Sequence, residues 1–227
     1  MSKINYDGFE LDTFDAAKKF RNYQIYYLKS YIKDPFLEVG AGQGGLTNLY
    51  KKFTKDITLI EPDKKLFQFL RKKFRKKNIK IKNQTIDKIK FKYQTIIYFD
   101  VLEHIKSDLK EVKIASKKLK KNGNLIFNVP AHQLFYNEFD KAVGHFKRYN
   151  KKDFKDIEKK TDLKIEKLIY YDSIGLIFLI LNKVFKLRDG NLKNKIYLWN
   201  LFIPLSRIID KLTFNTLGKS LFCVFKK

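Results

Sequence analysis

Short apolar runs alternate with amphipathic segments over the first 130 residues of the chain. Four of these runs are continuous and apolar, which is typical of parallel strands buried on both faces; they cover residues 36–39, 57–60, 95–99 and 125–129. Between them, apolar residues recur three or four positions apart, which predicts helices. A weaker strand is expected at 79–81 and a short helix at 85–89. The alternation predicts an α/β fold with a doubly wound, mostly parallel sheet, helices on both faces and ligands at the carboxyl ends of the strands.

Further helices and strands are expected on both sides of this core. One helix over residues 12–32 should lead into the first strand, and Asn122-Gly123 should close a helix at 108–120. After the fifth strand, residues 131–150 lose the periodicity and gather polar and aromatic side chains, a pattern more typical of functional loops. The rest of the pattern predicts a helix at 151–160, a strand at 163–171, helical pieces at 173–187 and 196–212, and a strand at 220–225.

The length of 227 residues suits one well-buried domain and is too short for two full enzyme domains. We therefore expect a single domain over residues 1–227. Within it we expect an N-terminal helix at 1–34, a ligand-binding core at 35–130, an insertion on the substrate side at 131–150, and C-terminal helices and strands at 151–227 that form a cap.

The charge balance is strongly basic. Against 24 Asp and Glu stand 49 Lys and Arg, so the formal net charge is +25. Only six of the basic residues are Arg, so a solvated Lys-rich surface explains much of the charge, and binding to nucleic acid or to an anionic membrane stays open. The single Cys223 excludes a disulfide framework and favours a reducing compartment. Because no apolar leader and no run of roughly 20 apolar residues is present, we expect a cytoplasmic protein.

Glycines follow the first strand directly. Gly40, Gly42 and Gly44 let the backbone turn tightly and bring its N–H groups against a ligand without a Cβ in the way. Glu61 ends the second strand, where an acidic side chain can accept both hydroxyls of a ribose. These features indicate a nucleotide-binding turn. On these residues alone the nucleotide is open, because Gly40-x-Gly42-x-x-Gly45 also fits the dinucleotide fingerprint.

The surroundings of this turn resemble the class I S-adenosylmethionine (SAM)-dependent methyltransferases, in particular the UbiG-like and type 11/23 members. The resemblance rests on the acidic-x-Gly-x-Gly-x-Gly motif at 38–44 and on residues 100–105, 119–125, 129–131 and 144–149. The ending, with residues 203–207, Asp210 and 218–221, is similar to members encoded among surface-polysaccharide genes. The resemblance implies a Rossmann-like, seven-stranded fold, SAM as cofactor and S-adenosylhomocysteine (SAH) as product.

The resemblance also implies a set of cofactor-binding residues. Glu38 and the backbone of the glycine turn would hold the methionine end of SAM, Glu61 would hold the ribose, and Asp100 would lie beside the methionine. The full implied set is Glu38, Gly40, Ala41, Gly42, Gly44, Glu61, Pro62, Asp100 and Val101. The adenine contact is expected in residues 84–86, where the family's usual Gly-Asp pair is absent.

All three histidines lie between residues 104 and 145. His104 follows the fourth strand, so its ring could take a proton from an acceptor hydroxyl; alternatively, it is a structural residue at a helix start. His145, Arg148 and Tyr149 could bind an anionic or sugar acceptor, or form a lid that packs on itself. We take His104 and His145 as catalytic candidates. The acceptor-binding candidates are Glu103, His132, Arg148 and Tyr149.

A metal ion is a further hypothesis for the same region. Asp100, Glu103, His104 and His145 resemble the Glu-x-x-Glu-His plus distant His arrangement of metal-dependent RNA-end and catechol-type methyltransferases. Two carboxylates and two imidazoles could hold a divalent ion that orients a diol. Because Asp100 stands where that arrangement has the longer Glu, metal dependence stays open.

The sequence thus predicts a SAM-dependent methyltransferase that acts on an oxygen of a small-molecule, glycan or lipid-linked acceptor. One alternative is an RNA methyltransferase, metal-assisted at an RNA end, which the basic charge would suit. Another is a non-catalytic SAM-fold subunit, against which the intact glycine turn and Glu61 argue. The apolar stretches 176–181 and 196–209 could rest on anionic lipid, giving a peripheral membrane contact. The cations beside them are Lys183, Lys186, Arg188, Lys193 and Lys195.

Overall fold

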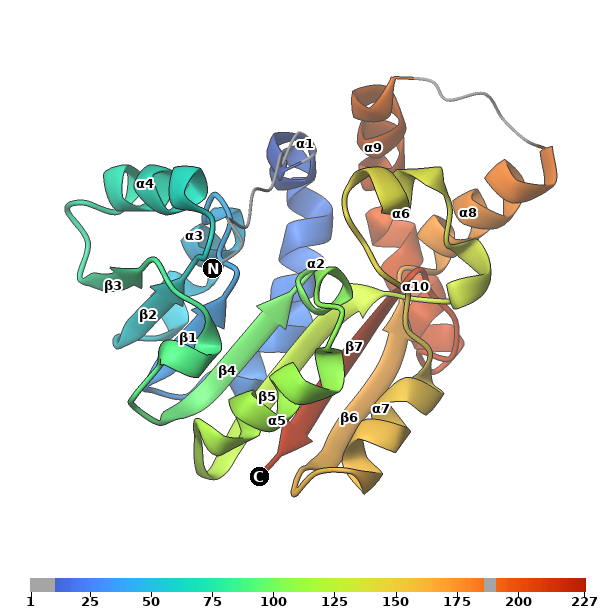
Figure 1. Ribbon diagram of the computed structural model, residues 1–227. Coiled ribbons are helices and arrows are strands. Elements are labelled where there is room, and N and C mark those ends of the chain that lie inside the picture. Colours follow the sequence, from blue (N-terminus) through green and yellow to red (C-terminus); the bar gives the residue numbers. More distant parts are fainter. Residues whose placement is uncertain (1–10, 186–190) are drawn as a thin grey trace.

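Seven strands form one sheet in the computed structural model, which describes residues 11–185 and 191–227 (Figure 1). The strand order is β3-β2-β1-β4-β5-β7-β6, and all strands are parallel except β7, which runs antiparallel to both neighbours. The strands are β1 Phe36–Val39, β2 Ile57–Ile60, β3 Ile79–Lys82, β4 Tyr93–Phe99, β5 Leu119–Pro130, β6 Lys164–Tyr171 and β7 Ser220–Lys226. The predicted α/β fold with a doubly wound, mostly parallel sheet is confirmed.

Helices cover both faces of this sheet (Figure 1). They are α1 Leu11–Ala16, α2 Lys18–Leu28, α3 Gly45–Tyr50, α4 Lys64–Lys73, α5 Asp108–Lys117, α6 Glu138–Ala142, α7 Lys151–Lys159, α8 Ser173–Phe185, α9 Leu192–Leu201 and α10 Ile203–Leu212. One apolar core lies between the sheet and α2, α3, α9 and α10, and a second lies between the sheet and α5 and α7. Because both faces are covered, the central strands read as continuous apolar runs.

The N-terminal segment is not the single helix expected over residues 12–32. It breaks at Ala17, whose φ of −75° and ψ of 63° are not helical, and continues as α2 and a 3-10 turn at Lys29–Tyr31. The break turns α1 toward the glycine turn, where Leu11 lies beside Gly42. Ala17 is buried, so packing rather than a local breaker residue sets the bend.

Two other helix predictions were wrong at their ends. Asn122-Gly123 does not close a helix: α5 ends at Lys117, and Asn122, with a φ of 60°, lies inside β5. Its partner β4 shifts register there, and a Cβ on Gly123 would come within 3.0 Å of Gln94 O, so the strand bulges at a glycine. The piece expected at 196–212 is two helices, α9 and α10, which meet at Phe202 just before Pro204.

The remaining elements follow the expected order, and the end of the helix predicted at 173–187 lies outside the described residues. The chain leaves the sheet after β5, passes through α6 and returns at α7. The division into core, insertion and cap stays a prediction. Among the helices that the structure describes, none is both long enough and apolar enough to span a bilayer.

The strand order reverses between β1 and β4, which makes the carboxyl ends of these two strands the place where such folds bind ligands. The residues after β1, β2, β4 and β5 therefore meet at one edge of the sheet.

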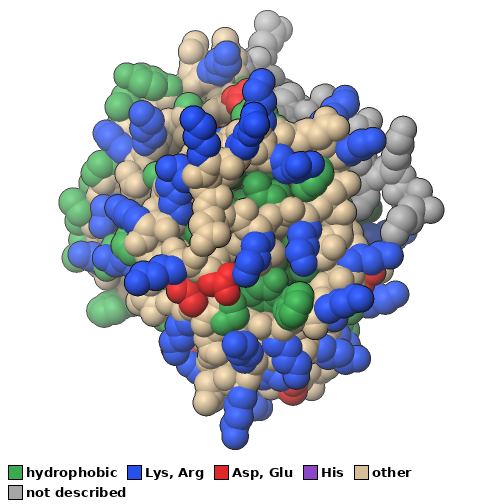
Figure 2. All heavy atoms as spheres, turned by 90° about the vertical axis from the view of Figure 1, so that its left-hand side faces the viewer, with side chains coloured by type: hydrophobic (Ala, Val, Ile, Leu, Met, Phe, Trp, Pro, Cys, Tyr) green, Lys and Arg blue, Asp and Glu red, His purple; other side chains and the backbone are tan. Residues whose placement is uncertain are grey.

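Basic charge is not confined to that edge of the sheet. Lys and Arg side chains are scattered over the face that carries α4 and β3 (Figure 2).

Candidate cofactor and acceptor site

The loop after β1 has the conformation that only glycine adopts readily. The φ angles of Gly40, Gly42 and Gly44 are 66°, 54° and 71°. A Cβ on Gly40 would lie 2.7 Å from Val101 Cγ2, so the turn also needs glycine for close packing against the residue after Asp100. The predicted glycine turn and the end of β4 are thus in direct contact.

Glu61 is tied to the glycine turn by its carboxylate. Its Oε2 accepts a hydrogen bond of 2.9 Å from Gly42 N, and its Oε1 accepts one of 2.9 Å from Asp63 N across Pro62. Burial raises the pKa of this carboxyl, and the two backbone N–H groups oppose the rise. The glutamate that ends β2 is therefore held beside the turn, in the place where a ribose ligand is predicted.

Glu38 lies beneath the turn rather than at its open side. Its Oε2 accepts hydrogen bonds from the Thr47 and Tyr50 hydroxyls of α3. The side chain is buried, and burial raises its pKa to about 7. In this structure Glu38 fastens α3 to β1, and its predicted contact with the methionine end of SAM stays a prediction.

Arg21 on α2 is a site residue that the sequence reasoning missed. It reaches Asp100 with Nη1 at 3.3 Å and Asp15 with Nη2 at 3.2 Å. Asp15 in turn occupies the space where a Cβ on Gly45 would stand. Only the scarcity of arginine in this lysine-rich chain could have pointed to Arg21, because its partners are remote in sequence or outside any motif.

Two buried donors at this place have no hydrogen-bond partner among the described residues. They are Arg21 Nε and Gln24 Nε2, although Gln24 Oε1 accepts from Arg21 Nη1 at 2.9 Å. A buried donor without an acceptor costs free energy unless a ligand or water satisfies it. The pair therefore fits a ligand with acceptor oxygens, such as the carboxylate of a bound methionine moiety.

Asp100 is fixed between two elements. Its backbone has a positive φ of 56°, its Oδ1 accepts from Asn128 Nδ2 at 2.8 Å, and its Oδ2 faces Arg21. Asn128 at the end of β5 is a second missed residue, and its Oδ1 accepts from the Tyr171 hydroxyl. Beyond β3, Asn83 Nδ2 donates to Glu61 O at 2.7 Å, so the loop that holds the predicted adenine contact at 84–86 joins the same edge.

His104 and His145 lie together, with ring centroids 4.6 Å apart and an interplanar angle of 78°. Burial, and next the charge of His145, lower the pKa of His104 to about 4. His145 Nδ1 is 2.8 Å from Asp140 Oδ1, which leaves Nε2 facing Glu103 at 3.9 Å. The two histidines predicted as catalytic thus form one cluster, although 41 positions separate them in the sequence.

Glu103 completes this cluster. It is 1% exposed, and neither carboxylate oxygen has a hydrogen-bond partner among the described residues. Burial, and next the charge of Asp100, raise its pKa well above the ordinary value. One donor atom from each of Glu103, His104 and His145 lies within 4.8 Å of the others, a set that could hold a divalent ion. Asp100 faces Arg21 and Asn128 instead, so the structure brings together three of the four residues predicted for a metal.

The other acceptor candidates bond within the chain. Arg148 is buried, and its Nε and Nη2 donate to Asp140 at 2.9 Å. Tyr149 is fully buried, and its hydroxyl donates to Leu102 O. His132 Nε2 lies 2.9 Å from Gly218 O, and its ring stacks on Tyr170. These contacts hold residues 131–150 against the sheet. They are the kind of contact predicted for a lid that packs on itself. The acceptor-binding roles of these residues stay predictions.

Comparison with known proteins gives a family and a fold. A family model described as a methyltransferase domain, type 23, matches residues 16–168. Ribosomal RNA small subunit methyltransferase A from Mycoplasma mobile is 40% identical over 75 residues, which is 32% of this chain and 30% of that enzyme.

Two solved structures illustrate the fold. Coclaurine N-methyltransferase bound to N-methylheliamine and SAH has a TM-score of 0.62 at 16% identity, with 99% of this chain and 76% of that chain covered. The N-methyltransferase NodS from Bradyrhizobium japonicum WM9, in complex with SAH, has a TM-score of 0.62 at 14% identity, with 99% and 93% covered. At such identities the likeness shows the fold alone.

Proposed function

The chain belongs to the methyltransferase-domain family of class I, SAM-dependent enzymes, and from this membership we propose that it methylates an oxygen of a small-molecule or glycan acceptor. Its sheet order, with an antiparallel β7, is the fold of that class. The cofactor is SAM, and the product formed from it is SAH. The acceptor, the methylated atom and the residue roles below are the proposal.

The observation that carries the proposal is the arrangement of polar groups around the glycine turn. Glu61 accepts a hydrogen bond from Gly42 N. Beside Asp100, the buried donors Arg21 Nε and Gln24 Nε2 have no hydrogen-bond partner among the described residues. In our proposal Glu61 binds the ribose hydroxyls and Arg21 binds the methionine carboxylate. The carboxylate of Asp100 would then help to balance the positive sulfonium.

The histidine cluster supports an oxygen acceptor. SAM supplies an electrophilic methyl group, and the acceptor must lose its hydroxyl proton as the new carbon–oxygen bond forms and the carbon–sulfur bond breaks. A ring nitrogen of His104 receives that proton in our proposal, with His145 held in place by Asp140. If the cluster holds a divalent ion, then Glu103, His104 and His145 would bind it, and its chemistry would be to orient and polarise the acceptor oxygen.

Binding calorimetry tests the cofactor part. We expect heat with SAM and with SAH but none with NAD. The variant Gly42→Val should abolish binding, because valine resists a φ of 54°, and Glu61→Ala should weaken it. The exposed Glu166→Ala on β6 is the matched control. Binding of NAD without binding of SAM or SAH would overturn the proposal.

Transfer of label tests the acceptor part. The protein is incubated with SAM carrying a tritiated methyl group and an extract of the cells that produce it. The extract is then separated into small-molecule, lipid and nucleic-acid fractions. We expect alkali-stable label in the small-molecule or glycolipid fraction.

We also propose that the acceptor is a glycan or is lipid-linked, which the C-terminal resemblance at 203–207 supports. We propose a cytoplasmic location, which the unpaired, buried Cys223 supports.

An RNA acceptor is the second candidate. It is favoured by the net charge of +25 and by the partial match to a ribosomal RNA methyltransferase. In that case the label would enter the nucleic-acid fraction. RNA affinity would also fall steeply with salt, as expected when Lys and Arg displace counterions.

A further inference from the structure

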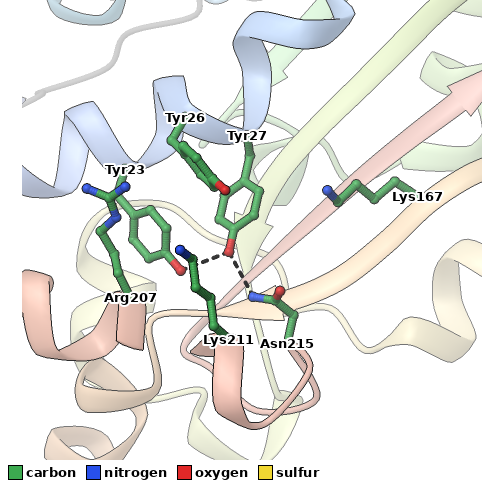
Figure 3. Close-up of a pocket in the computed structure, with 7 residues that line it drawn as sticks. All are labelled: Tyr23, Tyr26, Tyr27, Lys167, Arg207, Lys211 and Asn215. Atoms are coloured by element: carbon green, nitrogen blue, oxygen red, sulfur yellow. Dashed lines mark hydrogen bonds between the residues drawn. The ribbon is translucent and has the colours of Figure 1, made fainter. Parts of the chain in front are cut away.

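A basic hollow with aromatic walls lies between α2, α10 and β6, formed by none of the residues assigned above to cofactor or acceptor (Figure 3). Its volume is about 120 Å³, enough for a phosphate-sized group. The aromatic part consists of Tyr23, Tyr26 and Tyr27 on α2, and the cations are Lys167 on β6 and Arg207 and Lys211 on α10.

Hydrogen bonds hold the aromatic walls of the hollow in place. The Tyr23 hydroxyl donates to Asp210 Oδ2 at 2.8 Å and lies 2.8 Å from the Tyr27 hydroxyl. Asn215 Nδ2 donates to the same Tyr27 oxygen at 2.8 Å, as drawn in Figure 3. Because Asp210 is buried and also accepts from Asp172 N and Ser173 N, its charge is engaged inside the fold.

The cations lie around these tyrosines, and their N–H groups can donate hydrogen bonds to a ligand. Arg207 Cζ lies 5.1 Å from the Tyr26 ring centroid and 5.3 Å from that of Tyr23. Lys167 Nζ lies 5.3 Å from the Tyr27 centroid. Within residues 11–185 and 191–227, no ion pair joins Lys167, Arg207 or Lys211 to a carboxylate. Stacked guanidinium and ammonium groups without a counter-charge favour an anion with several oxygen atoms.

An apolar surface adjoins the hollow on α10. Leu205, Ile208 and Leu212 are exposed at i, i+3 and i+7, next to Arg207 and Lys211 on the same helix. Exposed apolar side chains are also found on α8 and α9, two helices that pack against α10. The largest exposed fractions are those of Val184 and Phe185 on α8, Tyr197 on α9, Leu212 on α10 and Phe214 after it, between 66% and 87%. Single exposed apolar residues are ordinary, but several on one helix, with more on the helices packed against it, favour a contact with another phase or partner.

The exposed charges that α8, α9 and α10 themselves carry have one sign, and the exposed carboxylate of Asp12 on the neighbouring helix α1 lines a hollow with Lys193 and Tyr197. Among the described residues of 173–217 the only carboxylate is that of Asp210, which is buried. The cations of the same stretch are Lys183, Lys193, Lys195, Arg207 and Lys211. Five exposed cations against the exposed carboxylate of Asp12 leave this surface strongly positive, and such a surface complements anionic headgroups better than a second protein with mixed charges.

We propose that the hollow formed by Tyr23, Tyr26, Lys167, Arg207 and Lys211 binds the phosphate of an anionic phospholipid while the apolar surface of α8, α9 and α10 rests on the membrane. Arg207 and Lys211 donate to the phosphate oxygens, and the tyrosine rings contact the carbon atoms of the headgroup. The apolar side chains of α10 then enter the boundary of the acyl chains. The proposal concerns a membrane site and does not depend on methyl transfer.

Co-sedimentation with vesicles tests the proposal on the full chain. Vesicles of phosphatidylcholine are compared with vesicles that also contain phosphatidylglycerol. We expect binding to the second kind, reduced by roughly tenfold or more in the double variant Arg207→Gln, Lys211→Gln. The matched control is Lys72→Gln, Lys76→Gln, which removes the same charge from exposed positions at the end of α4. It should lower binding much less.

The apolar surface and the ligand source are tested separately. The double variant Ile208→Gln, Leu212→Gln should weaken binding to anionic vesicles, although it leaves Arg207 and the rest of the hollow unchanged. Retained SAH binding and an unchanged circular dichroism spectrum show that a variant is folded, so a failure of the cofactor proposal is distinguishable. Absence of vesicle binding, an equal loss in the α4 control, binding of glycerol phosphate without vesicles, or RNA binding that depends on Arg207 and Lys211 in place of lipid binding would each overturn the proposal.

Discussion

The Arg21 guanidinium donates from Nη1 to Asp100 Oδ2 at 3.3 Å, across 79 positions of the sequence. Arg21 belongs to α2, and Asp100 follows β4. The contact therefore holds the N-terminal helix over the edge of the sheet where the strand order reverses. Since Asp15 lies 3.2 Å from the same guanidinium and packs against Gly45, helix α1, the glycine turn and the end of β4 form one connected site.

Replacing Arg21 should weaken cofactor binding. We expect Arg21→Ala to lower the affinity for SAM and SAH by roughly 10- to 100-fold, because a charge-assisted hydrogen bond to the methionine carboxylate is lost. Adenosine, which has no carboxylate, should bind the variant and the wild type alike. Calorimetry with SAH and adenosine checks both statements. A parallel loss for adenosine would mean that Arg21 acts through the fold rather than on the carboxylate.

Glu38 should make stability depend on pH. Its pKa is raised to about 7 by burial, whereas in the unfolded chain it is near 4.5. Between these values the unfolded state ionises and the folded state does not. Stability therefore falls as the pH rises from about 4.5 to about 7, by on the order of 3 kcal/mol at most. In Glu38→Gln this fall should vanish, because the amide oxygen still accepts from Thr47 and Tyr50 and carries no charge.

Urea unfolding at about pH 5 and about pH 8 measures this difference. Glu38→Gln should gain free energy of unfolding relative to the wild type at the higher pH. The exposed Glu166→Gln is the control for general charge effects. If the two variants respond to pH alike, then the Glu38 carboxyl is ionised in the folded protein at low cost, and our account of its burial is wrong.

The parts of this fold that follow from local patterns were predictable. The strands at 36–39 and 57–60 match the structure because each is an apolar run that ends at a turn or charged residue. The sequence also predicted that the glycine turn and Glu61 lie together, and Glu61 accepts a hydrogen bond from Gly42 N. Ala17 gave no signal of a break, because it favours helices and is bent by packing. Pro204 lies in the first turn of α10, where proline is common, but the continuous apolar stretch on both sides of it gave no sign that one helix ends and another begins there.

The site was predictable where a motif supplied it and not where tertiary contacts did. The metal hypothesis grouped Asp100 with Glu103 and His104, yet the Asp100 carboxylate, on a residue with positive φ, contacts Arg21 and Asn128 instead. Arg148 was predicted from its chemistry to bind the acceptor, but in the part of the chain that the structure describes its guanidinium donates to Asp140. Pairings of this kind depend on which distant segments meet, and no spacing in the sequence reports them.

His104 should matter for methyl transfer and not for cofactor binding. With an acceptor found by the label experiment, we expect His104→Asn to lower kcat by roughly 100- to 10,000-fold, the range for loss of a general base. The dissociation constant of SAH should stay within error of the wild type, because our proposal assigns His104 to the acceptor and not to the cofactor. An unchanged kcat would remove His104 from the reaction and leave it as a structural residue of the loop.

Metal binding by Glu103, His104 and His145 has a test that needs no acceptor. Two imidazoles and a carboxylate suit Co²⁺, Zn²⁺ or Mn²⁺, and Asp140 already orients His145 as a carboxylate beside a metal-bound histidine does. Titration with Co²⁺ should give visible absorption bands that saturate at one equivalent. Glu103→Gln should lose them.

The control for this titration is Glu111→Gln, which changes a glutamate that is hydrogen-bonded to Tyr98 and lies outside the cluster. It should keep the bands. The metal should also raise the thermal midpoint of the wild type and of Glu111→Gln, because a ligand that binds only the folded state stabilises it, and it should not raise that of Glu103→Gln. If Co²⁺ gives no bands and no stabilisation in the wild type, then the cluster holds no metal. In that case the raised pKa of Glu103, which favours the neutral carboxyl, is what lowers the cost of its burial.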